Sequence, residues 1–188
     1  MKIEFTKGKW EDFFIYAYSQ RFPFAPKFKQ EEDCIVNGRN PEMSDGFDYI
    51  TIFAKEKYGV GTKLSAVCSF EEYGAPLITI TDELTEDEEG NLKYRNYYEA
   101  VVWEEGLNVW KLYEEDGVMK WHMVMAVKFK LESNKKHEIR TEVVEKGWNI
   151  EIDGIKSYVR IEDLPTEFYI GITGCENINR FYSMEIEK

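Results

Sequence analysis

The chain has 188 residues, of which 43% are apolar and 15% aromatic, and its 36 acidic against 24 basic residues give a net charge of −12. This length suits a single domain over residues 1–188 with a substantial core, and the composition excludes a disordered chain. The negative charge repels phosphate backbones and anionic lipids, which argues against nucleic acid and membranes as partners.

The amino terminus has no apolar run of the kind that marks a signal peptide, and the longest segment without charge, 73–81, is too short to span a bilayer. The three cysteines, Cys34, Cys68 and Cys175, show neither close pairing nor metal-site spacing. Reduced thiols of this kind predict a cytoplasmic protein. A secreted protein trimmed of its leader would look the same, so this alternative stays open.

Apolar residues at every second position predict β-strands, because side chains in a strand alternate between its two faces. In the first half of the chain this pattern covers 10–18, 34–36, 47–55, 64–70 and 77–81. Pro23 and Pro26 end the first of these segments, since proline removes a ladder donor.

The charged segment 82–91 is predicted to be a solvated loop. Its clustered carboxylates are of the kind that bind calcium, but the segment lacks the alternating ligands, central glycine and distal glutamate of an EF-hand. His122 and His137 are the only histidines, which rules out a His-rich metal site. We therefore predict no metal and no cofactor, and a structural calcium ion is not indicated.

Three strands joined by tight turns are predicted next, at 97–103, 108–113 and 120–130, because Glu-Gly and Asp-Gly steps separate alternating segments. In the third strand, alternate residues from Trp121 to Phe129 are all apolar, which predicts one large apolar face. Further strands are predicted at 137–144, where a short helix is the alternative, and at 148–152, 155–161, 168–173 and 181–186. This spacing predicts an all-β fold, an antiparallel β-sandwich of jelly-roll type.

The carboxy-terminal segments Trp148–Lys156, Tyr169–Ile172 and Tyr182–Ile186 resemble the concanavalin A-like lectin/glucanase superfamily, which includes laminin-G-like domains and bacterial sugar-associated proteins. The resemblance implies a β-sandwich whose last strand returns beside the first, and frequent recognition of carbohydrate. Glu151-Ile152-Asp153 resembles the paired carboxylates of family 16 glycosidases. However, the third carboxylate of that motif is missing, and Asp153-Gly154 is better interpreted as a turn.

The three central strands offer a candidate ligand face. One face of each of these strands is expected to enter the core, and the opposite face then combines aromatic, acidic and basic groups. The residues expected in the core are Tyr98, Ala100, Val102, Trp110, Leu112, Trp121 and Met123. Aromatic rings stack on sugar rings and charged groups bind hydroxyls, so this face predicts a neutral carbohydrate ligand. Its members are Tyr97, Glu99, Trp103, Lys111, Tyr113, His122 and Lys128.

Two alternatives remain for this face. Glu99 and His122 are an acid/base pair if the protein is a glycoside hydrolase or polysaccharide lyase. The face instead contacts a protein if the domain is an interaction module. Residues 174–180 form a polar loop that is a candidate rim of the ligand site through Glu176, Asn177 and Arg180, and Cys175 in this loop is interpreted as a plain thiol rather than a nucleophile. The oligomeric state stays open.

Overall fold

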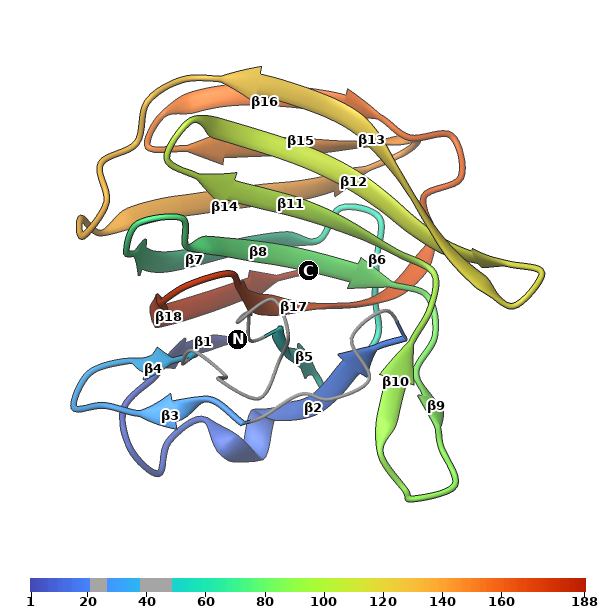
Figure 1. The fold of residues 1–188 in the computed structure, drawn as a ribbon, viewed down its shortest axis with the longest axis horizontal. Coiled ribbons are helices and arrows are strands. Elements are labelled where there is room, and N and C mark those ends of the chain that lie inside the picture. The colour runs from blue at the N-terminus through green and yellow to red at the C-terminus, as the bar shows by residue number, and fades with distance from the viewer. Residues whose placement is uncertain (21–26, 38–48) are drawn as a thin grey trace.

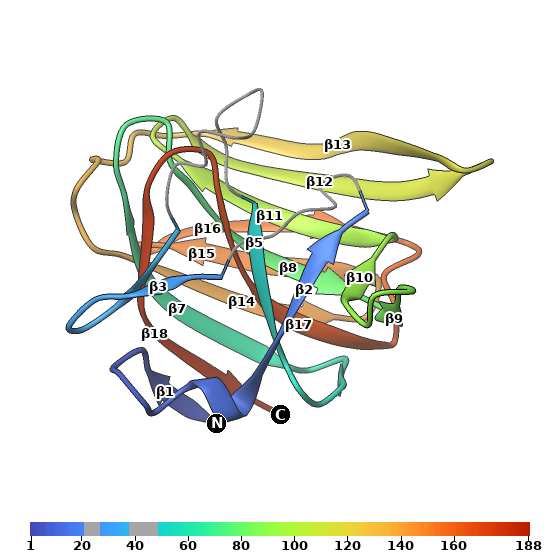
Figure 2. The same ribbon diagram turned by 60° about the horizontal axis from the view of Figure 1, so that its bottom comes forward.

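The computed structural model describes residues 1–20, 27–37 and 49–188. Two β-sheets pack face to face, and the described residues add only one short 3₁₀ turn, η1 (Glu11–Phe13). The layers are visible in Figure 1 and, turned by 60°, in Figure 2. The predicted all-β sandwich is therefore confirmed.

The small sheet follows the strand order β16-β15-β14-β7-β18-β4-β3, and β1 pairs with β18 outside this path. All of its pairs are antiparallel. Its strands are β16 (Ile155–Arg160), β15 (Gly147–Ile152), β14 (His137–Val144), β7 (Lys63–Phe70), β18 (Asn179–Glu187), β4 (Ile35–Val36), β3 (Lys29–Gln30) and β1 (Lys2–Glu4).

The large sheet follows the order β13-β12-β11-β8-β17-β5-β2-β10-β9, and β6 pairs with β17. Its pairs are antiparallel except for β10 with β2, which run parallel. Its strands are β13 (Val118–Lys128), β12 (Gly106–Glu115), β11 (Tyr97–Trp103), β8 (Ala75–Thr81), β17 (Glu167–Cys175), β5 (Ile50–Ala54), β2 (Phe14–Ser19), β10 (Leu92–Tyr94), β9 (Thr85–Glu86) and β6 (Tyr58–Gly59).

The main core lies between the two sheets and takes one face of each strand. The large sheet contributes alternate residues such as Ile78 and Ile80 from β8, and the small sheet contributes residues such as Trp148 and Ile150 from β15. Each of these side chains is almost fully buried. Because a strand can offer only alternate residues to this core, the other face of the large sheet, here called the distal face, carries a separate set of side chains.

The last strand returns beside the first, as the resemblance implies: Met184 of β18 pairs with Ile3 of β1. The two termini accordingly lie close together in both views (Figure 1, Figure 2). The tip of the β12–β13 hairpin projects beyond the rest of the sandwich in both views.

Several predicted segments change in detail. The strand expected over 10–18 begins only at Phe14, because the backbone N–H of Phe13 bonds to the carbonyl of Trp10 and closes η1. The charged segment 82–91 includes the short strand β9, which pairs with β10, so it is a hairpin rather than a plain loop. Pro23, Pro26 and the first residues of the 47–55 segment lie outside the described residues.

Candidate functional site

Strand β11 has the two faces expected from the sequence. Tyr98, Ala100 and Val102 point into the main core, so Tyr97, Glu99 and Trp103 lie on the distal face. Here period-two alternation was a sufficient guide to which side chains face the core.

The expectation for β12 was wrong. Tyr98 pairs with Lys111, and Tyr97 pairs with Leu112. Directly paired residues of neighbouring strands share a face. Lys111 and Tyr113 therefore lie on the core side of the sheet, near its edge, whereas Trp110 and Leu112 lie on the distal face.

The expectation for β13 was also wrong, because a β-bulge interrupts its single apolar face. Val109 pairs with Met125 and Trp110 pairs with Met123, so Val124 is an extra residue between two neighbouring pairs. The bulge places Met125 toward the core, while Met123, two residues earlier, turns to the distal face.

This register separates the proposed acid/base pair. His122 pairs with Lys111 and shares the face of Tyr98, whereas Glu99 pairs with Trp110 on the distal face. The two side chains lie on opposite sides of the large sheet, so they cannot exchange a proton on one ligand. We call residues that pair directly with one another across adjacent strands a row. Lys128 pairs with Gly106, which pairs with Trp103, so Lys128 lies in the row of Trp103 and stays with Glu99 on the distal face.

Strands β11, β12 and β13 thus form an aromatic strip at the edge of the distal face, which we call the tryptophan margin. Trp121 is 56% exposed and Met123 is 45% exposed, and the other residues of the margin are exposed or partly exposed. The margin consists of Trp103, Asn108, Trp110, Trp121, Met123 and Lys128. Sequence reasoning missed Trp110 because both faces of β12 carry apolar groups, and it missed Trp121 because the bulge in β13 interrupts the apolar face that alternation predicts.

The rest of the distal face is closed by its own side chains. Thr79, Thr173 and Thr51 lie on the neighbouring strands β8, β17 and β5, and all three are 0% exposed. Their hydroxyl groups form a hydrogen-bonded chain with distances of 2.7 Å between Thr79 and Thr173 and 2.8 Å between Thr173 and Thr51. The hydroxyl of Tyr94 continues it, 2.6 Å from that of Thr51.

An aromatic cluster covers this polar floor. The ring centroid of Tyr94 lies 5.1 Å from that of Phe53 and 4.7 Å from that of Tyr97, in edge-to-face contacts. The hydroxyl of Tyr97 lies 2.6 Å from that of Ser19, so it is already engaged within the protein. Tyr97 is therefore a buried support of the distal face rather than an exposed platform.

Glu99 is only 5% exposed. Its row across the sheet runs through Trp110 and Met123 on one side and Thr79 on the other. The described residues of this row and of the two adjacent rows on β8, β11, β12 and β13 include no other carboxylate. Glycoside hydrolysis ordinarily needs a pair of carboxyl groups, so these rows do not supply that pair.

Lys111 and Tyr113 lie instead in a small crevice of about 300 Å³ at the end of the sandwich. The Lys111 ammonium forms an ion pair with Asp163, and the Tyr98 hydroxyl donates a hydrogen bond to the same carboxylate. The ammonium also lies 5.3 Å from the ring centroid of Tyr113. These contacts join the loop before β17 to the large sheet and give Lys111 a structural partner.

The 174–180 loop is held by internal bonds. The side-chain amide of Asn177 donates a hydrogen bond to the backbone carbonyl of Glu72. The backbone carbonyl of Asn177 accepts a 3.0 Å hydrogen bond from the side-chain amide of Asn37. Arg180 forms ion pairs with Glu31 at 3.3 Å and Glu71 at 2.9 Å. Asn177 and Arg180 thus support the fold.

Arg180 also lies on the wrong side to serve as a rim. It precedes the core residue Phe181 on β18, so its side chain points out of the small sheet. Glu176 is partly exposed and follows Cys175 at the end of β17. Of the three predicted rim residues, only Glu176 stays a prediction as a contact for a ligand on the distal face.

No group of three or more candidate metal-ligating side chains occurs among the described residues. In the 82–91 segment, the Asp87 carboxylate accepts hydrogen bonds from the backbone N–H groups of Glu89 and Asn91, which is the role of a turn residue. His137 is buried, with Nδ1 2.6 Å from the Asp153 carboxylate and Nε2 2.9 Å from the Glu132 carbonyl. Both its nitrogen atoms therefore serve the fold.

The thiols differ in their surroundings. Burial raises the pKa of the Cys34 thiol to about 12, with a further contribution from a hydrogen bond to Glu31. Burial also raises the pKa of Cys68, which is fully enclosed. Cys175 is partly exposed and packs beside the aromatic cluster of the distal face.

Within the described part of the chain, no helix is long and apolar enough to cross a membrane.

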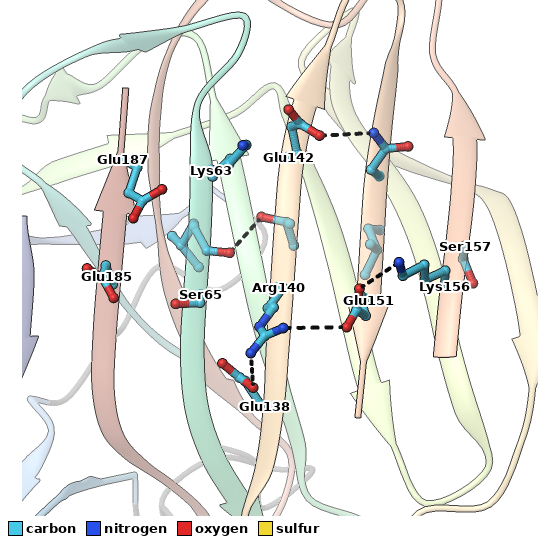
Figure 3. A pocket seen from close by; sticks show the side chains of 14 residues that line it. Lys63, Ser65, Glu138, Arg140, Glu142, Glu151, Lys156, Ser157, Glu185 and Glu187 are labelled. Atoms are coloured by element: carbon cyan, nitrogen blue, oxygen red, sulfur yellow. Dashed lines mark hydrogen bonds and ion pairs between the residues drawn. The ribbon is translucent and has the colours of Figure 1, made fainter. Parts of the chain in front are cut away.

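A larger hollow, of about 500 Å³, lies on the outer face of the small sheet over β7, β14, β15, β16 and β18. Figure 3 shows Arg140 between Glu138 and Glu151, with Lys156 next to Glu151. The charged groups of Arg140 lie 2.8 Å from Glu138 and 3.7 Å from Glu151, and the Lys156 ammonium lies 3.7 Å from Glu151. None of the described residues that line this hollow is aromatic. These charges pair along β14, between Glu138 and Arg140, and across neighbouring strands to Glu151, as is usual on a solvated sheet face.

No protein-family model and no curated protein sequence matches the chain. Among solved structures, β-agarase A from Zobellia galactanivorans superimposes with a TM-score of 0.70 at 11% identity, covering 99% of this chain and 89% of the agarase. The legume lectin-like domain from Entamoeba histolytica gives 0.59 at 15% identity, with 99% and 96% covered. Carbohydrate-binding module CBM66 from Bacillus subtilis gives 0.57 at 14% identity, with 81% and 92% covered. The chain therefore has the concanavalin A-like β-sandwich fold that its carboxy-terminal segments resemble.

Proposed function

We propose that this protein binds neutral carbohydrate through the tryptophan margin. The observation that carries the proposal is the presence of three tryptophans on one face of three adjacent strands, with Trp121 more than half exposed. Indole rings offer flat apolar surfaces on which sugar rings stack. Asn108 and Lys128 lie on the same face and can bond to sugar hydroxyls.

The charge of the protein supports a neutral ligand. A net charge of −12 repels polyanionic glycans, and Lys128 is a single cation on the margin. The similar structures include a carbohydrate-binding module, a lectin-like domain and an agarase, which supports a carbohydrate-related function, although a shared fold is compatible with many functions.

Binding is favoured over hydrolysis. Glu99 faces away from His122, and its neighbouring rows hold no second carboxylate among the described residues. An interaction module is the less favoured function, because the tryptophan margin includes polar groups in two of its rows, at Asn108 and at Lys128, rather than a continuous apolar patch.

The test compares Trp121→Ala with Tyr158→Ala. Tyr158 is an equally exposed aromatic residue, at 52%, but it lies on β16 in the small sheet. In calorimetric titrations with neutral polysaccharides, Trp121→Ala is expected to weaken binding by about 2- to 10-fold, the value of one aromatic contact. Tyr158→Ala is expected to bind like the wild type.

Release of reducing ends is measured in the same samples. No turnover is expected; turnover that Glu99→Gln abolishes would favour the glycosidase alternative. Failure of the wild-type protein to bind any neutral glycan, or equal binding by both variants, would refute the proposed site.

A further inference from the structure

We infer that the ligand is an extended oligosaccharide that lies along strands β11 to β13, rather than a single sugar or a chain laid across the sheet. This inference rests on the proposed function and assigns the ligand its shape and direction. It follows from which parts of the distal face are accessible and from where the three tryptophans lie.

A path across the sheet is closed. Such a path would cross β8, β17 and β5, where Thr79, Thr173 and Thr51 form the floor. These threonines are 0% exposed, and their hydroxyls bond to one another. Tyr94 and Phe53, which cover the floor, are also almost fully buried. A ligand would have to displace this packed cluster to reach it.

A path along the strands is accessible. Trp103, Trp110 and Trp121 lie on β11, β12 and β13, so each is displaced by one strand from the previous one. Trp103 shares its row with Gly106, and Trp110 shares its row with Glu99. With a rise of about 3.3 Å per residue and about 4.8 Å between strands, the Cα atoms of Trp103 and Trp110 are about 14 Å apart.

The second step is shorter. Trp121 pairs with Leu112, two residues beyond Trp110 on β12, which places the Cα atoms of Trp110 and Trp121 about 8 Å apart. The three tryptophans therefore lie on a diagonal of about 22 Å that runs mainly along the strands. A single sugar ring cannot reach both ends of this diagonal, so only a chain of several sugars contacts all three indoles.

The spacing is uneven, and this makes the inference specific. Trp110 and Trp121 form a close pair that a short oligosaccharide can span. Asn108, one row nearer the Gly106 turn, lies between Trp110 and Trp103 and offers an amide to sugar hydroxyls. Trp103 is reached only by the longer members of a series. The increase of affinity with oligosaccharide length should therefore depend on Trp103.

The experiment titrates the wild-type protein, Trp103→Ala and Trp121→Ala with cello-, laminari- and agaro-oligosaccharides from disaccharide to octasaccharide. Wild-type affinity is expected to rise on the order of 10-fold once the chain reaches Trp103. Trp103→Ala should abolish this rise, whereas Tyr158→Ala, outside the margin, should keep both the rise and the disaccharide affinity. Trp121→Ala should weaken binding at every length and keep the rise. Melting temperatures check that both variants fold, and Tyr158→Ala is the matched control.

The outcomes separate the two proposals. Affinity that does not depend on chain length, or a rise that survives in Trp103→Ala, overturns the extended path while leaving carbohydrate binding intact. Absence of binding by the wild-type protein at every length overturns both. Weakening by Thr79→Val to the same extent as by Trp103→Ala would indicate a path across the sheet instead.

Discussion

Replacing Thr173 by valine tests whether the hydroxyl chain under the distal face stabilises the fold. Thr173 is the central member, hydrogen-bonded to Thr79 at 2.7 Å and to Thr51 at 2.8 Å, and all three residues are 0% exposed. Valine keeps the shape and removes both bonds. A buried hydrogen bond contributes about 0.5–1.5 kcal/mol net, and the orphaned Thr79 hydroxyl adds a desolvation penalty.

We therefore expect Thr173→Val to lower the free energy of unfolding by about 2–3 kcal/mol. For a domain of this size that is a fall in melting temperature of about 4–12 °C. Thr79→Val is the matched comparison, because Thr79 makes only one of the two bonds, and it should cost about half as much. Urea denaturation and calorimetry measure both variants and the double variant.

The double variant decides the matter. It removes no bond that Thr173→Val has not already removed, so the two single effects should not add, and the coupling between them should be about 1 kcal/mol. Additive effects, or a Thr173→Val cost no larger than that of Thr79→Val, would refute the hydroxyl chain as a stabilising network.

Three further outcomes are expected. A Cβ atom on Gly171 would overlap the carbonyl oxygen of Ile52, so Gly171→Ala should destabilise the fold by about 2 kcal/mol or more in urea, and an unchanged midpoint would contradict this close strand approach. Burial acts to raise the pKa of Asp163, but hydrogen bonds from Lys111 and a tyrosine hydroxyl outweigh it, and the pKa lies below its ordinary 3.8. A carboxyl group whose pKa is lower in the folded than in the unfolded state stabilises the fold at every pH above its unfolded-state pKa. This stabilisation is lost as the pH falls through the folded-state pKa. Asp163→Asn should therefore be less stable than the wild type at neutral pH and equally stable in strong acid. Iodoacetamide should alkylate Cys175 before the other two thiols, whose pKa values are raised by burial, and equal labelling of all three in peptide mass spectra would contradict this.

The strands and their turns could be predicted from the sequence because they depend on local chemistry. Period-two alternation located most of the long strands, and it also gave the faces of β11 correctly. Asp116-Gly117 and Asp153-Gly154 mark two hairpins, and all four residues have positive φ, a conformation that these residue types tolerate. Short strands such as β1, β3 and β10 were not predicted, since two or three residues become a strand only through their partners.

The faces of β12 and β13 were decided only by the tertiary structure. Both faces of the large sheet are apolar, one toward the main core and one toward the aromatic cluster with Tyr94 and Leu112, so alternation in β12 fitted either orientation. The bulge at Val124 then exchanged the faces within β13, which no periodicity reveals. Glu99 and His122 were separated, and Trp110 and Trp121 were brought together, because pairing register is a property of neighbouring strands and not of either strand alone.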